Sequence, residues 1–218
     1  MISVRLKSLV KYIDNNDKVI DIGCDHALLD IYLVHNKKLS KMIVSDIHKN
    51  ALDSGITNIK KYGLEDKIEA RLGNGLDVLS SFDQIDTVLI SGMGTMTIMN
   101  ILDNEYVDKI RKLVIQSNRD YDILREKVVN MGFYIESEEV VTERGKIYIN
   151  IVFLRGQKNY TNIELKYGTT NMINKSLYYN YLISKDKEII NNIHDEENKK
   201  RFLEEISFLE KLLKKYPK

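Results

Sequence analysis

The sequence predicts a doubly wound α/β sheet followed by a C-terminal helical hairpin. Short apolar, strand-like stretches alternate with amphipathic helical stretches through residues 4–131, which is typical of a parallel sheet covered on both faces. Two longer strand-like segments, 133–142 and 146–154, meet at Arg144-Gly145 and predict an antiparallel hairpin at one edge of the sheet. Residues 172–215 have no strand pattern, and their apolar residues recur at three- and four-residue steps instead.

The elements of the sheet region follow from the local pattern. A first helix is expected at residues 4–13, where the apolar face is formed by Leu6, Leu9, Val10 and Ile13. The expected strands are 18–22, 42–46, 68–72, 86–90 and 112–116, and the expected helices between them are 27–35, 49–62, 95–102 and 120–131. Gly63 and Gly132 are expected to end two of these helices, because glycine readily adopts the left-handed conformation of a helix C-cap.

The polar, irregular residues 156–170 predict a domain boundary, with a sheet domain at residues 1–156 and a helical tail at 157–218. The two tail helices are expected to bury Leu177, Tyr181, Ile189, Ile190 and Ile193 in the first, and Phe202, Ile206, Leu209, Leu213 and Tyr216 in the second. A break is expected at His194-Asp195-Glu196. The tail should therefore form an antiparallel, coiled-coil-like hairpin.

The composition excludes several classes of protein. Hydrophobic residues make up 43% and charged residues 30% of the 218 residues, which is typical of a soluble globular protein. No apolar run is long enough to span a membrane and no secretory signal precedes the first helix, so the chain is expected to stay in the cytoplasm. One cysteine and four scattered histidines predict neither a disulfide framework nor a metal site. The single proline, Pro217, excludes an Asn-Pro-Pro-aromatic clamp for amino-group methylation of adenine.

Charge is distributed unevenly along the chain. Residues 1–155 carry 21 Lys and Arg against 23 Asp and Glu, a balance of −2. Residues 156–218 carry 12 against 9, a balance of +3. A basic tail is compatible with a nucleic-acid partner and equally with an ordinary solvated helical surface.

Glycine, aspartate and asparagine follow the expected strands at positions where a doubly wound sheet binds its ligands. In such folds the ligand lies at the carboxyl ends of the strands, near the switch in strand order. The segments that fall there are 21–26, Asp46, 73–75, 91–94 and 116–118. A tight turn or a helix N-cap explains any one of them, but explains the whole set less well.

The spacing favours a cofactor that has a ribose and no phosphate. Asp46 lies 23 residues beyond Gly23, the spacing at which an acidic residue meets a ribose diol. The turn after the first strand has only one glycine and carries the carboxylate of Asp25, which would repel a pyrophosphate. S-adenosylmethionine therefore fits better than a dinucleotide.

Four motifs occur in order along the chain: Asp-Ile-Gly-Cys-Asp-His-Ala-Leu-Leu at 21–29, Gly-Asn-Gly-Leu at 73–76, Ile-Ser-Gly-Met-Gly at 90–94 and Ile-Gln-Ser-Asn at 115–118. Together they resemble the bacterial tRNA (adenine-N1)-methyltransferases that act on adenine 22 of the D-arm. The resemblance extends over about residues 4–154 and continues more weakly into the tail. It implies a class I methyltransferase fold of the Rossmann-like type.

The resemblance also implies roles for individual residues. Its cofactor-binding set is Asp21, Gly23, Asp46, Ile47, Asn74, Gly75, Ser91, Gly92 and Met93. Asp21 and Gly23 would line the methionine end, Asp46 would hold the ribose, Asn74 would face the adenine, and residues 91–93 would form the floor beneath the target base. Asp25, with His26 beside it, would be catalytic. Arg5 and Asn118 are further candidates for contact with the tRNA. Independently of the resemblance, the basic tail predicts contacts with tRNA phosphates, and its candidate residues are Lys175, Lys185, Lys187, Lys199, Lys200, Arg201, Lys211, Lys214 and Lys215.

The sequence departs from the family pattern at three positions. Asn74 stands where the family usually has aspartate, and Asp30 and Ser117 each replace a proline. An asparagine can still hydrogen-bond adenine, whereas loss of both prolines affects the shape of the pocket for the target base.

Methylation at adenine N1 agrees with the residues that are present. Adenine N1 is unprotonated at neutral pH and can attack a sulfonium methyl directly, so a carboxylate that orients the base and stabilises the resulting cation is sufficient. Asp25 suits that role, although it could instead cap the helix at 27–35. Two other functions stay open: methylation of a protein or small molecule, and RNA binding without catalysis. A monomer acting on tRNA is expected.

Overall fold

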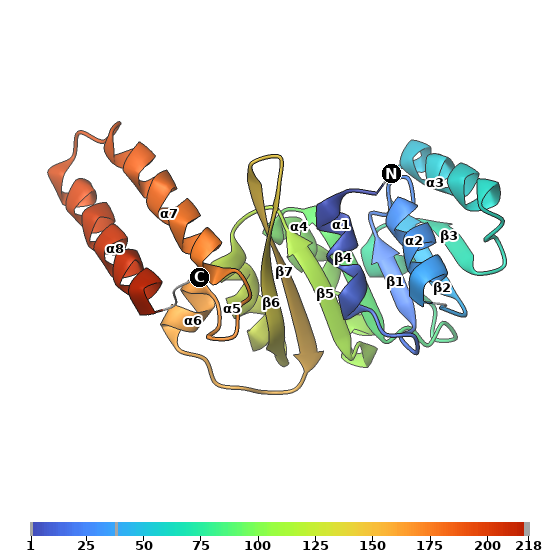
Figure 1. Ribbon diagram of the computed structural model, residues 1–218. Coiled ribbons are helices and arrows are strands. Elements are labelled where there is room, and N and C mark those ends of the chain that lie inside the picture. The colour runs from blue at the N-terminus through green and yellow to red at the C-terminus, as the bar shows by residue number, and fades with distance from the viewer. Residues whose placement is uncertain (1, 38, 216–218) are drawn as a thin grey trace.

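The computed structural model describes residues 2–37 and 39–215, which contain a seven-stranded sheet of order β3-β2-β1-β4-β5-β7-β6 (Figure 1). The strands are β1 (Val19–Ile22), β2 (Met42–Asp46), β3 (Ile68–Leu72), β4 (Thr87–Met93), β5 (Lys112–Ser117), β6 (Phe133–Glu143) and β7 (Lys146–Arg155). The first five run parallel, and β7 pairs antiparallel with both β5 and β6. The predicted doubly wound sheet with an antiparallel hairpin at its edge is confirmed.

Helices cover both faces of the sheet. The α-helices are α1 (Val4–Lys7), α2 (Leu28–Lys37), α3 (Lys49–Lys61), α4 (Thr95–Leu102), α5 (Tyr121–Asn130), α6 (Asn162–Tyr167), α7 (Lys175–Ile190) and α8 (Glu196–Lys215), and the 3-10 helices are η1 (Val10–Tyr12), η2 (Gly75–Val78) and η3 (Glu105–Lys109). Alternate residues of β1 point to opposite faces. Val19 packs with α2 and α3, whereas Ile20 and Ile22 pack with α4 and α5.

Two expectations about local structure are wrong. The helix expected at residues 4–13 is interrupted: α1 makes one turn after the Ser3 N-cap, and η1 follows. The interruption lies at Ser8, whose hydroxyl donates to the Arg5 carbonyl and accepts from Asn150 on β7. The segment 156–170, expected to be irregular, contains α6. Thr161 begins that helix with a capping box to Glu164, a signature that is visible in the sequence.

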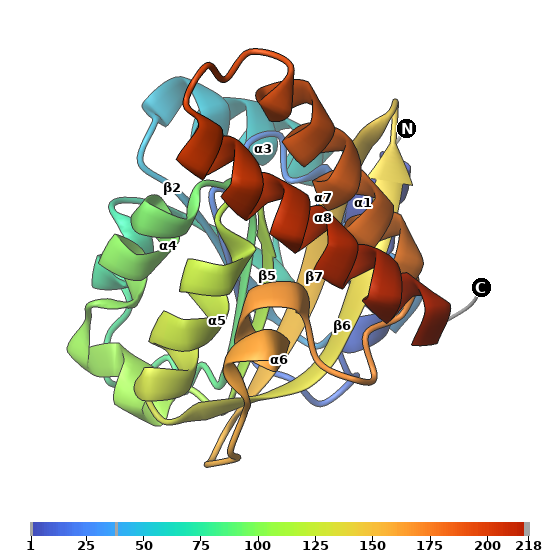
Figure 2. The same cartoon turned by 90° about the vertical axis from the view of Figure 1, so that its left-hand side faces the viewer.

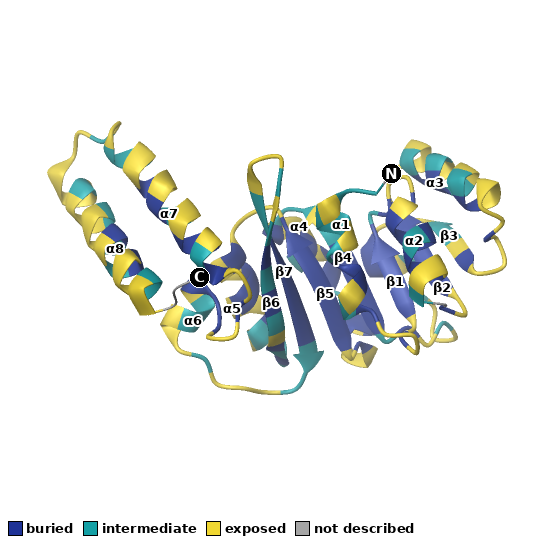
Figure 3. Cartoon of the chain, in the orientation of Figure 1, coloured by how far each residue is buried: buried dark blue, intermediate teal, exposed yellow. Residues whose placement is uncertain are grey.

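The tail helices α7 and α8 form the expected antiparallel hairpin, which projects from the β6 end of the sheet (Figure 1). Figure 2 shows the pair crossing in front of the sheet beside α5 and α6. Their buried apolar side chains join the core of the α5 face; they are Tyr178, Tyr179, Ile183, Ile206 and Leu209. Leu177 and Tyr181, which were expected to be buried, are 37% and 43% exposed, because a different face of α7 packs on the core. Most of the remaining helix surface is exposed (Figure 3). Tyr216, which was expected on the buried face of α8, lies outside the described residues.

Among the described residues, no helix is both long enough and apolar enough to cross a membrane.

Candidate active site

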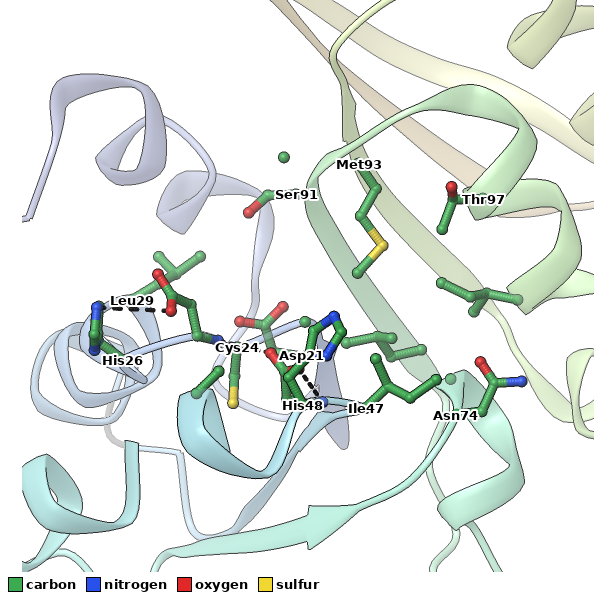
Figure 4. Close-up of a pocket in the computed structure, with 18 of the residues that line it drawn as sticks. Asp21, Cys24, His26, Leu29, Ile47, His48, Asn74, Ser91, Met93 and Thr97 are labelled. Atoms are coloured by element: carbon green, nitrogen blue, oxygen red, sulfur yellow. Dashed lines mark hydrogen bonds and ion pairs between the residues drawn. The ribbon is translucent and has the colours of Figure 1, made fainter. Parts of the chain in front are cut away.

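A cavity of about 680 Å³ opens at the carboxyl ends of β1, β2 and β4 (Figure 4). The sequence-predicted residues that line it are Arg5, Asp21, Gly23, Asp25, His26, Asp46, Ile47, Asn74, Gly75, Ser91, Gly92 and Met93. These residues come from segments separated by up to about 90 positions in the chain. The fold brings them together because parallel strands end at the same edge of the sheet.

The turn between β1 and α2 presents Asp25 and His26 to the cavity. Gly23, Asp25 and Ala27 have φ of +80°, +50° and +53°, a left-handed conformation that is uncommon outside glycine. The Gly23 and Cys24 amides both donate to the Ser45 carbonyl, at 2.8 and 3.1 Å, and so fix the turn on β2. Backbone strain of this kind is concentrated at functional sites, where the surrounding structure maintains it.

The side chains of Asp25 and His26 are available to a ligand. They are 69% and 56% exposed, and Asp25 Oδ1 lies 3.6 Å from His26 Nε2. Within the described part of the chain, no backbone amide of α2 donates to the Asp25 carboxylate. The N-cap alternative for Asp25 is therefore wrong.

Two buried carboxyls form the acidic end of the cavity. Asp46 is 8% exposed, and its two oxygens accept from the amides of Asp25 at 3.3 Å and His48 at 2.8 Å. Asp21 is 3% exposed, and its Oδ1 has no hydrogen-bond partner among the described residues. Burial raises the pKa of Asp21 to about 7; the neighbouring carboxyl of Asp30 opposes this rise, and the nearby charge of Asp46 adds to it.

The opposite end of the cavity is less charged. Gly75 has φ +55°, and a β-carbon there would lie 3.0 Å from Ile101 Cγ2, so the loop approaches α4 closely. Asn74, beside it, donates from Nδ2 to Asp77 Oδ2 at 3.4 Å. Ile47 is 59% exposed and adds an apolar wall. Figure 4 shows Asn74, Thr97 and Met93 across the cavity from His26.

Polar contacts with β5 and β7 hold Arg5 at the rim of the cavity. Its Nη1 donates to Gln116 Oε1 at 2.7 Å, and its guanidinium lies 5.2 Å from the centre of the Tyr148 ring. Gln116 is fully buried and also donates to Asn150 Oδ1 at 2.6 Å. Gln116 therefore positions Arg5 and does not itself line the cavity.

Some of the expected substrate-binding residues do not line the cavity. Asn118 is exposed, and its Nδ2 donates to the Gly92 carbonyl at 2.7 Å, so it braces the turn after β4. Lys199, Lys200 and Arg201 lie on α8. Figure 1 shows α8 beyond the β6 end of the sheet, whereas α2 and α3 lie at the other end.

The sequence analysis missed Thr97 and Asn100, which line the cavity from α4. Both are polar residues in an otherwise largely apolar helix, and this contrast could have indicated that they face a ligand. It also missed His48 and Ala51, which extend the wall beyond Asp46. Their positions immediately after a strand-end aspartate carried no separate signal.

The comparisons with known proteins agree with this geometry. A family model described as a methyltransferase domain matches residues 2–151. The chain is 32% identical over 171 residues to a tRNA (adenine(22)-N(1))-methyltransferase of Bacillus subtilis (strain 168), covering 77% of this chain and 71% of that protein.

Solved structures resemble the chain over nearly its whole length. A Streptococcus pneumoniae protein superposes with a TM-score of 0.88 at 27% identity, over 98% of this chain and 100% of that one. M. capricolum TrmK, solved in complex with S-adenosyl-homocysteine, superposes with a TM-score of 0.86 at 32% identity, over 98% of each chain. The similarity therefore includes the tail as well as the sheet.

Proposed function

Because the chain belongs to the family of tRNA (adenine(22)-N(1))-methyltransferases, we propose that it transfers a methyl group from S-adenosylmethionine to N1 of adenine 22 in tRNA. It is a methyltransferase, and S-adenosylmethionine is its cofactor. The observation that best supports the proposal is the cavity, which gathers the strand-end residues of the family motifs around one space. A cytoplasmic monomer is the proposed working unit.

The residues of the cavity fit the cofactor. The unpartnered Oδ1 of Asp21 is an acceptor suited to an ammonium group. Gly23 has no β-carbon, which lets the terminal methyl of Met93 lie against the turn; any larger residue there would collide with it. Asp46 retains free lone pairs on both oxygens for a ribose diol, and Asn74 with Ile47 suits an adenine. When bound, the cofactor supplies a sulfonium-activated methyl group. Asp21, Gly23, Asp46, Ile47, Asn74 and Gly75 are proposed to hold it, above a floor formed by Ser91, Gly92 and Met93.

The proposed role of Asp25 is to orient the target base. Its carboxylate is positioned to accept a hydrogen bond from the exocyclic amine of adenine, which directs N1 toward the methyl group. The ring becomes cationic as N1 is methylated, and the adjacent negative charge stabilises it. His26, 3.6 Å from Asp25, is proposed to support the orientation of that carboxylate. Arg5 and Asn118 are proposed to face the tRNA beside the base.

The position of the methyl group is the direct test of the function. Unmodified tRNA is incubated with the protein and radiolabelled cofactor, digested, and analysed for the modified nucleoside and its position. Label in 1-methyladenosine at nucleotide 22 is expected. Label in protein, in another nucleoside or at another adenine would contradict the proposal.

Asp46→Ala is expected to weaken cofactor binding by about 1.5–3 kcal/mol, the range for hydrogen bonds to a charged group. The substitution also removes the acceptor for the Asp25 and His48 amides, so a second variant is needed. Asp46→Asn keeps one acceptor and should lose less affinity. Titration calorimetry with S-adenosylhomocysteine measures both, and unchanged affinity in Asp46→Ala would rule out the ribose-binding role.

The tail, residues 157–218, is proposed to bind the body of the tRNA through phosphates. Its exposed cationic residues include Lys185, Lys187, Lys200, Arg201, Lys211 and Lys214. Lys199 is partly buried and lies 3.7 Å from Glu196. Lys175, which the sequence analysis grouped with these lysines, is buried and donates to the Thr169 carbonyl at 2.6 Å, so its assignment to phosphate binding is wrong.

Charge reversal tests the tail better than truncation does. A chain ending near Gln157 would expose the core residues that α7 and α8 cover, so its loss of tRNA binding could follow from unfolding. Substituting glutamate for Lys199, Lys200 and Arg201 leaves the buried faces of both helices intact. Reversing Lys60 and Lys61, which are exposed at the end of α3, is the matched control.

The tail variant is expected to bind tRNA weakly, while the control stays near wild type. Each lost phosphate contact should also reduce the slope of log affinity against log salt by about 1. Filter binding at several salt concentrations measures both effects. Equal affinities for the two variants would count against the 199–201 cluster.

A further inference from the structure

Three carboxyls meet behind the cavity, and one of them lies outside the proposed cofactor contacts. Asp21 is the third residue of β1, Asp46 ends β2, and Asp30 is the third residue of α2. Asp21 points to the α2 face of the sheet because it alternates with Ile20 and Ile22, which pack on the other face. Asp30 is completely buried and does not line the cavity.

The pair formed by Asp21 and Asp30 lacks partners that would stabilise two negative charges. Both oxygens of Asp30 and Oδ1 of Asp21 have no hydrogen-bond partner within residues 2–37 and 39–215. Neither residue forms an ion pair there. Two adjacent carboxylates in a dry environment cannot both stay ionised at modest free-energy cost. The amino-terminal end of α2 favours negative charge on Asp30, but each such effect is small.

We propose that Asp30 is a positioning residue that keeps a proton and donates it in a hydrogen bond to Asp21, so that the pair offers one negative charge to the amino group of the cofactor. The inference rests on the proposed cofactor site. It accounts for a carboxyl buried where an apolar residue would be expected. Binding of the cationic amino group then favours ionised Asp21. A proton that Asp21 held before binding passes to the buffer, while Asp30 remains protonated.

The groups that surround the pair agree with this assignment. From α2 the neighbour of Asp21 is Asp30, which as a hydrogen-bond donor favours a charge on Asp21, and from β2 it is Asp46, whose own charge disfavours it. From the turn, Cys24 is a neutral thiol whose pKa is raised by burial and by these same carboxyls. Asp25 and His26 extend into the open cavity. From β4 the register partner of Asp21 is Leu89, which carries no charge.

Proton release on binding is the first readout. Calorimetric titration of the protein with S-adenosylhomocysteine at pH 7, in phosphate and in Tris, gives the number of protons released from the difference in enthalpy. With the pKa of Asp21 at about 7, roughly half a proton per site is expected from wild type. In Asp30→Asn the amide supplies the same hydrogen bond to Asp21, so proton release and affinity should stay near those of wild type. Asp30→Leu removes the donor and so raises the pKa of Asp21 further, and at pH 7 it should bind more weakly and release more protons.

Stability against pH is the second readout and needs no ligand. The pKa values of Asp21 and Asp30 are both raised by burial, and that of Asp30 also by the charge of Asp21. Between about pH 4 and their folded pKa values, the folded chain holds protons that the unfolded chain has lost. Their contribution to the free energy of unfolding is therefore largest at low pH and declines as pH rises. The melting temperature of wild type should decline relative to Asp30→Asn between pH 5 and 8.

The outcomes separate this inference from the proposed function. Binding of S-adenosylhomocysteine without proton release in wild type, or with wild-type affinity and release in Asp30→Leu, would overturn the role of Asp30 and leave the cofactor site standing. Absence of binding in either protein would overturn the cofactor site. In that case the melting profiles still test whether Asp30 keeps a proton. If the melting temperatures of wild type and Asp30→Asn change in parallel between pH 5 and 8, Asp30 does not keep one. If Asp30→Leu does not fold, the melting profiles of wild type and Asp30→Asn decide the question.

Discussion

Replacing Asp25 is expected to abolish nearly all methyl transfer to tRNA while cofactor affinity stays close to wild type. The carboxylate has the two properties that base orientation requires. It is 69% exposed, and the left-handed turn holds it out at the cavity beside His26. A positioned group that acts in the transition state typically contributes about 10²–10⁴-fold to the rate, so kcat should fall by that factor.

Asp25→Asn is the preferred variant because the backbone sets a constraint. The residue has φ +50°, a conformation that asparagine tolerates better than alanine, so the turn should be preserved. The amide removes the negative charge with almost no change in volume. The hydrogen bond from the Asp25 amide to Asp46 Oδ2 is also unaffected, which keeps the ribose-binding carboxylate in place.

The measurement compares single-turnover methylation of tRNA with calorimetric affinity for S-adenosylhomocysteine. His26→Gln is the companion variant, and it should reduce the rate less than Asp25→Asn. An active Asp25→Asn enzyme would refute the role of the carboxylate. A loss of cofactor affinity that matches the loss of rate would place Asp25 in the cofactor site instead.

The sequence was most informative where strands end. Asp21, Asp46 and Ser91 are distant in the chain, yet each lies at or near the carboxyl end of an apolar strand. Parallel strands end at one edge of the sheet, so these residues come together there. Residues in the helices were harder to assign. Asp30 has the pattern of an ordinary acidic residue in the first turn of a helix, and only its packing against β1 shows that it is buried. Lys175 was misassigned because lysine is usually exposed and its burial depends on tertiary contacts.

The sequence pattern also did not predict how the tail is attached to the sheet. The segment 156–170 is polar and was expected to be irregular, whereas it contains α6, which packs against α5. Arg125 on α5 and Glu138 on β6 form an ion pair beneath it, with both side chains completely buried and 2.6 Å between Nε and Oε1. Arg125 also donates to the Leu165 carbonyl, and Glu138 accepts from the Thr169 amide. One buried pair thus fastens the start of the tail to the sheet.

Arg125→Met is therefore expected to lower the free energy of unfolding by about 3–5 kcal/mol, the usual loss when one partner of a buried ion pair is removed. The loss arises because Glu138 would remain buried with no opposite charge, and because the Leu165 carbonyl would lose its donor. The double variant Arg125→Met with Glu138→Gln also removes the unpaired negative charge of Glu138, and its glutamine keeps an acceptor for the Thr169 amide. It should recover much of the lost stability.

Urea denaturation followed by circular dichroism measures all three proteins. A single variant as stable as wild type would show that the pair contributes nothing to the fold. A double variant no more stable than the single one would show that the loss comes from packing around the arginine and not from the charge of Glu138. Recovery in the double variant would identify the buried charge as the reason that the sheet and the start of the tail depend on each other, since Glu138 holds the Thr169 amide just before α7.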